Sequence, residues 1–139
     1  YSTYDKPDGS KLSALTNNHK LYYHKLGTPQ SEDKLIFGDD KNPRRYVGAG
    51  VTEDGKFLVI SAANSTTGNE LYLQDLTKPN TPIVQIVSDM DNNHSIEDHQ
   101  DGVFFIHTNY KSPNYRLVKM TLDASNKDQW VDLIPETEN

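Results

Sequence analysis

The chain has 139 residues, which suits one ordinary domain, and 34% of these residues are apolar. Its net charge of −6 makes nucleic acid a poor candidate partner, because an acidic surface repels phosphate. Cysteine is absent, so no disulfide supports the fold, and no apolar run is long enough to span a membrane. The first residue is Tyr1 instead of methionine, which favours a fragment of a longer protein.

The predicted elements are strands separated by turn residues. Glycine, proline, asparagine and aspartate punctuate the chain, and no window has apolar residues at helical spacing, so we predict no helix. Residues 5–20 are predicted to be a loop, although a hairpin at Asp8-Gly9 with residues 11–15 as its second arm is an alternative. The apolar and β-branched runs predict strands at residues 1–4, 21–26, 33–37, 46–52, 57–61, 70–76, 83–87, 94–97, 103–109, 115–120 and 129–134.

The clearest local unit is the hairpin in residues 51–63. Asp54-Gly55 supplies the turn, and residues 57–61 are nearly all apolar, which predicts a strand buried on both faces. A related unit follows at Asp101-Gly102, and the two turn glycines lie 47 residues apart. A period of this size is typical of β-propeller blades.

Longer segments of the chain also repeat. The hexads LYYHKL, LYLQDL and YRLVKM begin at residues 21, 71 and 115, and each precedes a further apolar strand. The pattern predicts an all-β fold in which four-stranded antiparallel blades recur about every 45 residues. We therefore expect a partial propeller with a partial blade in residues 1–38 and full blades in residues 39–88 and 89–139.

Blades bury their faces only against neighbouring blades. A segment with two full blades and one partial blade therefore leaves apolar sheet faces open. We expect the remaining blades of a longer chain to cover these faces. The segment alone is expected to self-associate through its terminal blades, and a light-scattering mass of one chain at high concentration would count against this.

The sequence offers no catalytic apparatus of its own. It contains no Gly-x-Ser-x-Gly elbow and no cysteine nucleophile, and none of its five histidines stands in a motif with serine and aspartate. We therefore predict no catalytic residue, no cofactor and no metal site. The histidines are His19, His24, His94, His99 and His107.

Two segments superficially suggest metal binding. Residues 94–99, HSIEDH, hold two histidines and two carboxylates, but an odd spacing of five in a strand predicts opposite faces for His94 and His99. Residues 89–93 resemble the start of a calcium loop but lack its later glycine and glutamate, so a solvated acidic loop is the better interpretation.

Two further patterns favour structural roles. Arg44-Arg45 is too short for a basic patch and is predicted to be a solvated turn. Tyr22, Tyr72 and Tyr115 recur at similar places in the repeat, and such an aromatic stripe more often packs than binds a ligand.

The chain resembles the propeller domain of the prolyl oligopeptidase family. The LYYHKLGTPQSED and SPNYRL runs carry the most specific part of this similarity. The resemblance implies a seven-bladed propeller that caps an α/β-hydrolase domain, which holds the catalytic triad and cleaves short peptides after proline. The similar segments are residues 20–37, 53–61, 69–76 and 108–120.

The resemblance also implies positions that face the substrate cavity. Tyr46 takes the place of a methionine that borders the substrate proline in mammalian members, and an aromatic ring there could still cover a proline. Ala63 and Thr66 stand where those members have an arginine and a cysteine. The loss of the arginine removes a charged donor to substrate carbonyls, whereas Thr66 is small and polar enough to line the cavity.

The leading hypothesis is therefore a gating segment that filters substrates for a proline-specific serine oligopeptidase. Its implied partners are the hydrolase domain, the remaining blades and short proline-containing peptides. The alternatives are a stand-alone propeller scaffold that binds proteins or peptides, with contacts in residues 6–18 and 64–69, and a β-sandwich binding module.

Overall fold

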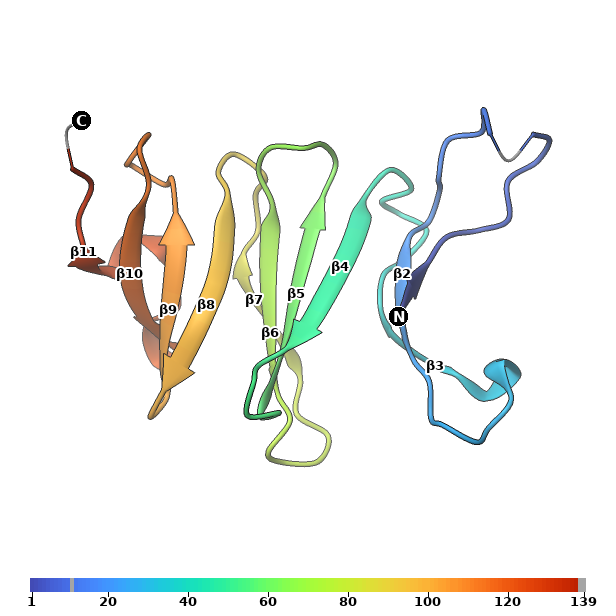
Figure 1. The fold of residues 1–139 in the computed structure, drawn as a ribbon, viewed down its shortest axis with the longest axis horizontal. Helices are drawn as coiled ribbons and strands as arrows, with labels where there is room; N and C mark the ends of the chain where they lie inside the picture. Colours follow the sequence, from blue (N-terminus) through green and yellow to red (C-terminus); the bar gives the residue numbers. More distant parts are fainter. Residues whose placement is uncertain (11, 138–139) are drawn as a thin grey trace. The chain divides into compact units, whose positions relative to one another are not determined.

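The computed structural model describes residues 1–10 and 12–137 as three antiparallel sheets (Figure 1). The strand orders are β1-β2-β3, β4-β5-β6-β7 and β11-β10-β9-β8. Within the described residues there is no α-helix, so the predicted all-β class with partial propeller blades is confirmed. The elements are β1 (Ser2–Thr3), β2 (Lys20–Tyr23), η1 (Gln30–Glu32), β3 (Lys34–Phe37), β4 (Tyr46–Val51), β5 (Phe57–Ala63), β6 (Glu70–Asp75), β7 (Ile83–Val87), β8 (His94–Gln100), β9 (Val103–Thr108), β10 (Arg116–Thr121), η2 (Leu122–Ala124), η3 (Lys127–Gln129) and β11 (Val131–Ile134).

The contacts within the chain define two compact units, Tyr1–Ala49 and Gly50–Asn139. In the first unit, Leu21 of β2 is buried and lies between Ser2 of β1 and Phe37 of β3. The predicted strand at residues 21–26 ends early, at Tyr23. Directly after it, His24 Nδ1 lies 2.6 Å from the Asp33 carboxylate.

The segment before β2 is a loop, as predicted. Lys11, which begins the alternative hairpin arm, lies outside the described residues, and Leu12 to Leu15 form no strand. The backbone N–H groups of Ser13 and Ala14 instead donate to the Ser10 carbonyl, which makes a local turn.

In the second unit, the Asp54-Gly55 turn forms as predicted. Gly55 has φ +74°, and its N–H donates to the Thr52 carbonyl at 2.8 Å. The strand that follows, β5, differs from the prediction of burial on both faces. Ile60 and Ala62 are fully buried, whereas the other residues of β5 are half-buried, so only one face of its second half is fully covered.

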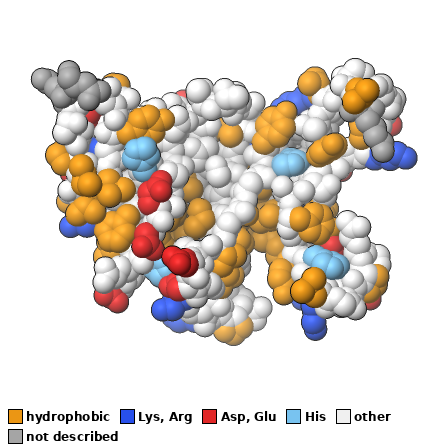
Figure 2. All heavy atoms as spheres, viewed as in Figure 1, with side chains coloured by type: hydrophobic (Ala, Val, Ile, Leu, Met, Phe, Trp, Pro, Cys, Tyr) orange, Lys and Arg blue, Asp and Glu red, His pale blue; other side chains and the backbone are white. Residues whose placement is uncertain are grey.

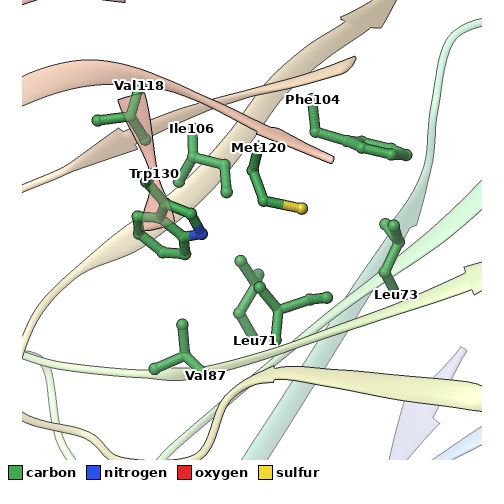
Figure 3. Close-up of a cluster of buried hydrophobic side chains, with 9 residues drawn as sticks. Leu71, Leu73, Val87, Phe104, Ile106, Val118, Met120 and Trp130 are labelled. Carbon is green, nitrogen blue, oxygen red and sulfur yellow. The ribbon is translucent and has the colours of Figure 1, made fainter. Parts of the chain in front are cut away.

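The main hydrophobic core of the second unit forms between its two sheets. Side chains of β6 and β7 meet side chains of β9 and β10, and Trp130 closes one side of the cluster (Figure 3). Full burial of one such side chain stabilises a fold by about 1.5–3 kcal/mol. The sheets therefore depend on each other, as blades do. The buried members are Leu71, Leu73, Ile86, Val87, Phe104, Ile106, Val118, Met120 and Trp130.

A repeated irregularity confirms that the sheets share one plan. The pairing of the last two strands shifts at Leu21/Tyr22, at Leu71/Tyr72 and at Leu117/Val118. Leu117 is therefore the counterpart of Leu21 and Leu71, and the predicted equivalence of Tyr115 with Tyr22 and Tyr72 is wrong. Tyr115 precedes β10 and has φ +68°, so it is not part of the strand.

The last sheet exposes apolar side chains on β11, and hydrophobic groups gather at this end of the surface (Figure 2). Val131 and Ile134 are 59% and 58% exposed, and Leu133 is also exposed. Within the described residues, no helix is long and apolar enough to cross a membrane.

Candidate functional site

Tyr46 presents an exposed aromatic ring at the first position of β4. The ring is half-exposed and packs edge-on against His19, with a centroid distance of 6.0 Å. The Val47 N–H donates to His19 Nδ1 at 2.8 Å, so the imidazole accepts through Nδ1. Tyr4 also stacks on His19. The rings of His19 and Tyr4 therefore support the ring of Tyr46. The sequence did not predict this contact, because His19 lies in a loop without a motif.

The residue before Tyr46 corrects another prediction. Arg45 is 8% exposed, so it is not part of a solvated turn. Its guanidinium lies 5.0 Å from the centre of the Phe37 ring and 3.8 Å from the Asp39 carboxylate. Arg45 thus fixes the backbone from which β4 begins.

Ala63 and Thr66 belong to the second unit, in and after the end of β5. Ala63 is half-buried at the last position of β5, and Thr66 is exposed in the loop that leads to β6. Within this loop, Ser65 Oγ donates to the Thr67 carbonyl at 3.1 Å. The loop therefore offers a small apolar side chain and a free hydroxyl.

The end of this loop is clamped to the start of β8. The Gly68 N–H donates to Asn93 Oδ1 at 2.6 Å, and Asn69 exchanges hydrogen bonds with both the N–H and the carbonyl of His94. Gly68 has φ +77°, and a Cβ there would lie 1.7 Å from the Met90 carbonyl oxygen. Only glycine fits this close approach.

His94 is buried behind the clamp and stays neutral. Its Nδ1 lies 2.9 Å from Thr108 Oγ1, and its ring packs edge-on against Trp130. Burial lowers the pKa of His94 to about 4, and the nearby Lys127 adds to this effect. Its Nε2 has no hydrogen-bond partner among the described residues.

The predicted opposite orientation of His94 and His99 is wrong. A bulge at Glu97 inserts one residue into β8, so His94, Ile96 and His99 pair with Thr108, Ile106 and Phe104, which share one face of β9. The two histidines still have separate partners. Among residues 1–10 and 12–137, no group of three or more histidines or carboxylates could hold a metal ion.

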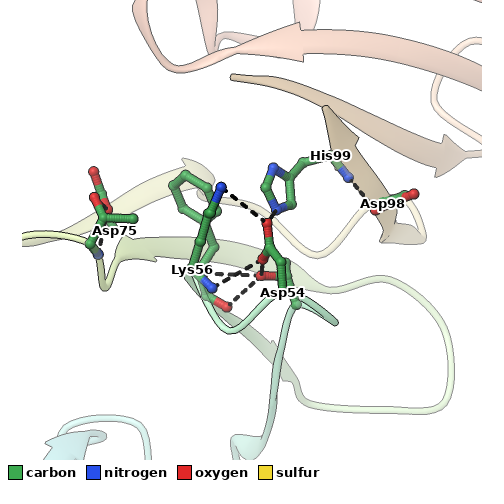
Figure 4. Close-up of polar contacts among 8 residues, drawn as sticks. Asp54, Lys56, Asp75, Asp98 and His99 are labelled. Atoms are coloured by element: carbon green, nitrogen blue, oxygen red, sulfur yellow. Dashed lines mark hydrogen bonds and ion pairs between the residues drawn. The ribbon is translucent and has the colours of Figure 1, made fainter. Parts of the chain in front are cut away.

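His99 joins the two sheets at the opposite end of β8 (Figure 4). Its Nε2 lies 2.7 Å from the Asp54 carboxylate, and its ring packs against the rings of both Phe57 and Phe104, which also contact each other. The hydrogen bond from His99 lowers the pKa of Asp54 to about 2. The Asp-Gly turn is thus tied to the neighbouring sheet.

The acidic segment at residues 89–93 is largely committed to protein partners. The Asp89 carboxylate lies 2.6 Å from Lys127 Nζ, which lowers the pKa of Asp89. The Asn93 amide bonds both Gly68 and Tyr115. The segment therefore supports the clamp.

Comparison with known proteins gives the family. All of residues 1–139 match the family described as prolyl oligopeptidase, N-terminal beta-propeller domain. A prolyl endopeptidase of Elizabethkingia meningoseptica is 50% identical over 138 residues, which are 99% of this chain and 19% of that protein. Prolyl oligopeptidase A of Galerina marginata is 31% identical over 123 residues, which are 85% of this chain and 16% of that protein.

Solved structures agree with this assignment. Prolyl oligopeptidase B from Galerina marginata, bound to a 35mer hydrolysis and macrocyclization substrate, matches the whole chain with a TM-score of 0.83 and 27% identity. The match covers 20% of that protein. A structure from work on inter-domain dynamics in the catalysis and specificity of two prolyl endopeptidases matches with a TM-score of 0.79 and 25% identity.

This chain belongs to the prolyl oligopeptidase family and is a segment of its N-terminal β-propeller domain. It spans about a fifth of the length of the relatives that it matches.

Proposed function

We propose that this chain is part of the gating propeller of a proline-specific serine oligopeptidase. The observation that carries the proposal is the match of the whole chain to the N-terminal propeller domain, together with 50% identity to a prolyl endopeptidase. The sequence holds no nucleophile elbow and no cysteine, which suits a segment that shapes access and leaves catalysis to another domain.

In this proposal the segment comprises successive blades, with residues 1–38 as a partial blade and residues 39–88 and 89–139 as full blades. The remaining blades cover the exposed apolar side chains of β11, and the segment alone associates through this face. An α/β-hydrolase domain of the same protein supplies the catalytic triad.

Tyr46, Ala63 and Thr66 are the residues that we assign to the substrate cavity. The exposed ring of Tyr46 offers a flat apolar surface for a proline ring. The exposed Thr66 hydroxyl can donate to or accept from a peptide group. The substrates are short proline-containing peptides.

The proposal is tested with a chromogenic prolyl peptide. The 139-residue segment should leave this peptide intact, whereas the longer protein that contains the segment should release the chromophore. A longer protein that folds but fails to cleave the peptide would contradict the enzyme assignment, and a stable protein partner without hydrolysis would favour a binding scaffold.

A further inference from the structure

A small cavity lies at the edge of the second unit where β8 begins and β9 ends. Its volume is about 260 Å³. It adjoins the clamp between the two sheets, because Asn69 contributes from one sheet and Asn93 from the segment that enters the other. The lining residues are Asn69, Asn93, His94, Ser95, His107 and Tyr115.

Tyr115 lines this cavity with its backbone in the left-handed region, which a tyrosine rarely adopts. A bulky residue at φ +68° is unusual, and such conformations persist only where surrounding contacts fix them. Here the Tyr115 N–H donates to the Ser112 carbonyl at 2.8 Å, and the Asn93 side chain donates to the Tyr115 hydroxyl at 2.7 Å. Strained residues of this kind cluster at functional sites.

His107 completes an aromatic pair with Tyr115. The two rings are nearly parallel, with an interplanar angle of 16° and a centroid distance of 4.6 Å. Tyr115 is half-buried, and His107 is exposed. The pair is therefore a preformed platform of aromatic faces with hydroxyl and amide groups beside it.

The cavity is close to a segment that we have assigned to the substrate. Thr66 lies three residues before Asn69 in the same loop, and the clamp fixes this loop to the cavity wall. The cavity therefore adjoins the end of the loop that carries Thr66. The volume suits one side chain, since sites for larger ligands begin at about 300 Å³.

We propose that this cavity, which we call the Tyr115 subsite, binds one uncharged ring-bearing residue of the peptide substrate, at a position other than the proline of the cleaved bond. The described residues that line its walls include no lysine and no arginine, so they offer no cation to an acidic side chain. They do offer aromatic faces for stacking and polar groups for the adjoining peptide bonds. This inference rests on the proposed function and extends it to a specificity-determining pair, Tyr115 and His107.

The experiment uses the full-length protein that contains this chain and pairs of short prolyl peptides that differ at one position, phenylalanine against alanine, scanned along the peptide. At one position the phenylalanine peptide should have a KM about two- to tenfold lower, the range expected for one aromatic contact. Tyr115→Leu and His107→Ala should each reduce this preference.

Tyr23→Leu is the matched control, because Tyr23 is an exposed tyrosine of β2 outside the cavity. An unchanged preference in folded Tyr115→Leu and His107→Ala proteins would overturn the subsite, and His107→Ala decides the question if Tyr115→Leu does not fold. If the wild type cleaves no peptide, the proposed function fails. The calorimetric affinities of the same peptide pair for wild type and His107→Ala then still decide whether the subsite exists.

Discussion

Replacing Gly68 with alanine is expected to lower the free energy of unfolding by about 2–4 kcal/mol. The added Cβ would lie 1.7 Å from the Met90 carbonyl oxygen and 2.6 Å from the Met90 carbonyl carbon, so backbone must move. That movement would break the hydrogen bond from the Gly68 N–H to Asn93 and loosen the clamp between the sheets. Urea unfolding of the wild type and the variant measures the difference.

Gly55→Ala is the matched control for this prediction. Gly55 has a similar φ of +74°, but a Cβ there would meet no atom within 4 Å. Gly55→Ala should lower the free energy of unfolding only by the cost of placing a Cβ residue at a positive φ, about 1–2 kcal/mol. Equal losses in the two variants would show that the contact with Met90 does not matter.

Lowering the pH from 7 to 4 is expected to destabilise the fold by roughly 3 kcal/mol through His94. Burial holds the pKa of His94 at about 4 in the folded state, against an ordinary value of 6.5. Between these values the unfolded chain binds a proton that the folded chain excludes, so stability is full above pH 6.5 and falls as the pH falls towards 4. Lys127, which lies nearby, opposes protonation, and Asp89 favours it.

The measurement is urea unfolding at several pH values for wild type, His94→Gln and His107→Gln. His94→Gln should flatten the dependence of the free energy of unfolding on pH between pH 6.5 and 4. His107→Gln replaces an exposed histidine and should leave this dependence as in the wild type. Below this range Asp54 adds a further loss as the pH falls from its ordinary value of 3.8 towards 2, because its carboxylate then loses its charge. The same slope in His94→Gln as in wild type would contradict the assignment.

The strands were predictable because their signals are local. A continuous apolar run and an Asp-Gly turn define the hairpin that ends in β5, and the same chemistry recurs before β9. The resemblance to the prolyl oligopeptidase family rested on short runs of residues and agrees with the match over the whole chain.

The features that sequence reasoning missed depend on contacts between distant segments. A single extra residue at Glu97 reverses the side-chain direction along β8, and no local pattern marks it. Arg45 is buried because its guanidinium contacts the Phe37 ring and the Asp39 carboxylate. Tyr115 keeps a positive φ because Asn93 and Ser112 form hydrogen bonds with it. Each of these depends on a partner that only the folded chain supplies.

The central claim is that the propeller filters substrates for a hydrolase domain. Its most direct measurement compares kcat/KM for prolyl peptides of increasing length between the full-length protein and its isolated hydrolase domain. We predict a steep fall with length for the full-length protein and a shallow one for the isolated domain. Identical length profiles for two active proteins would contradict the gating role.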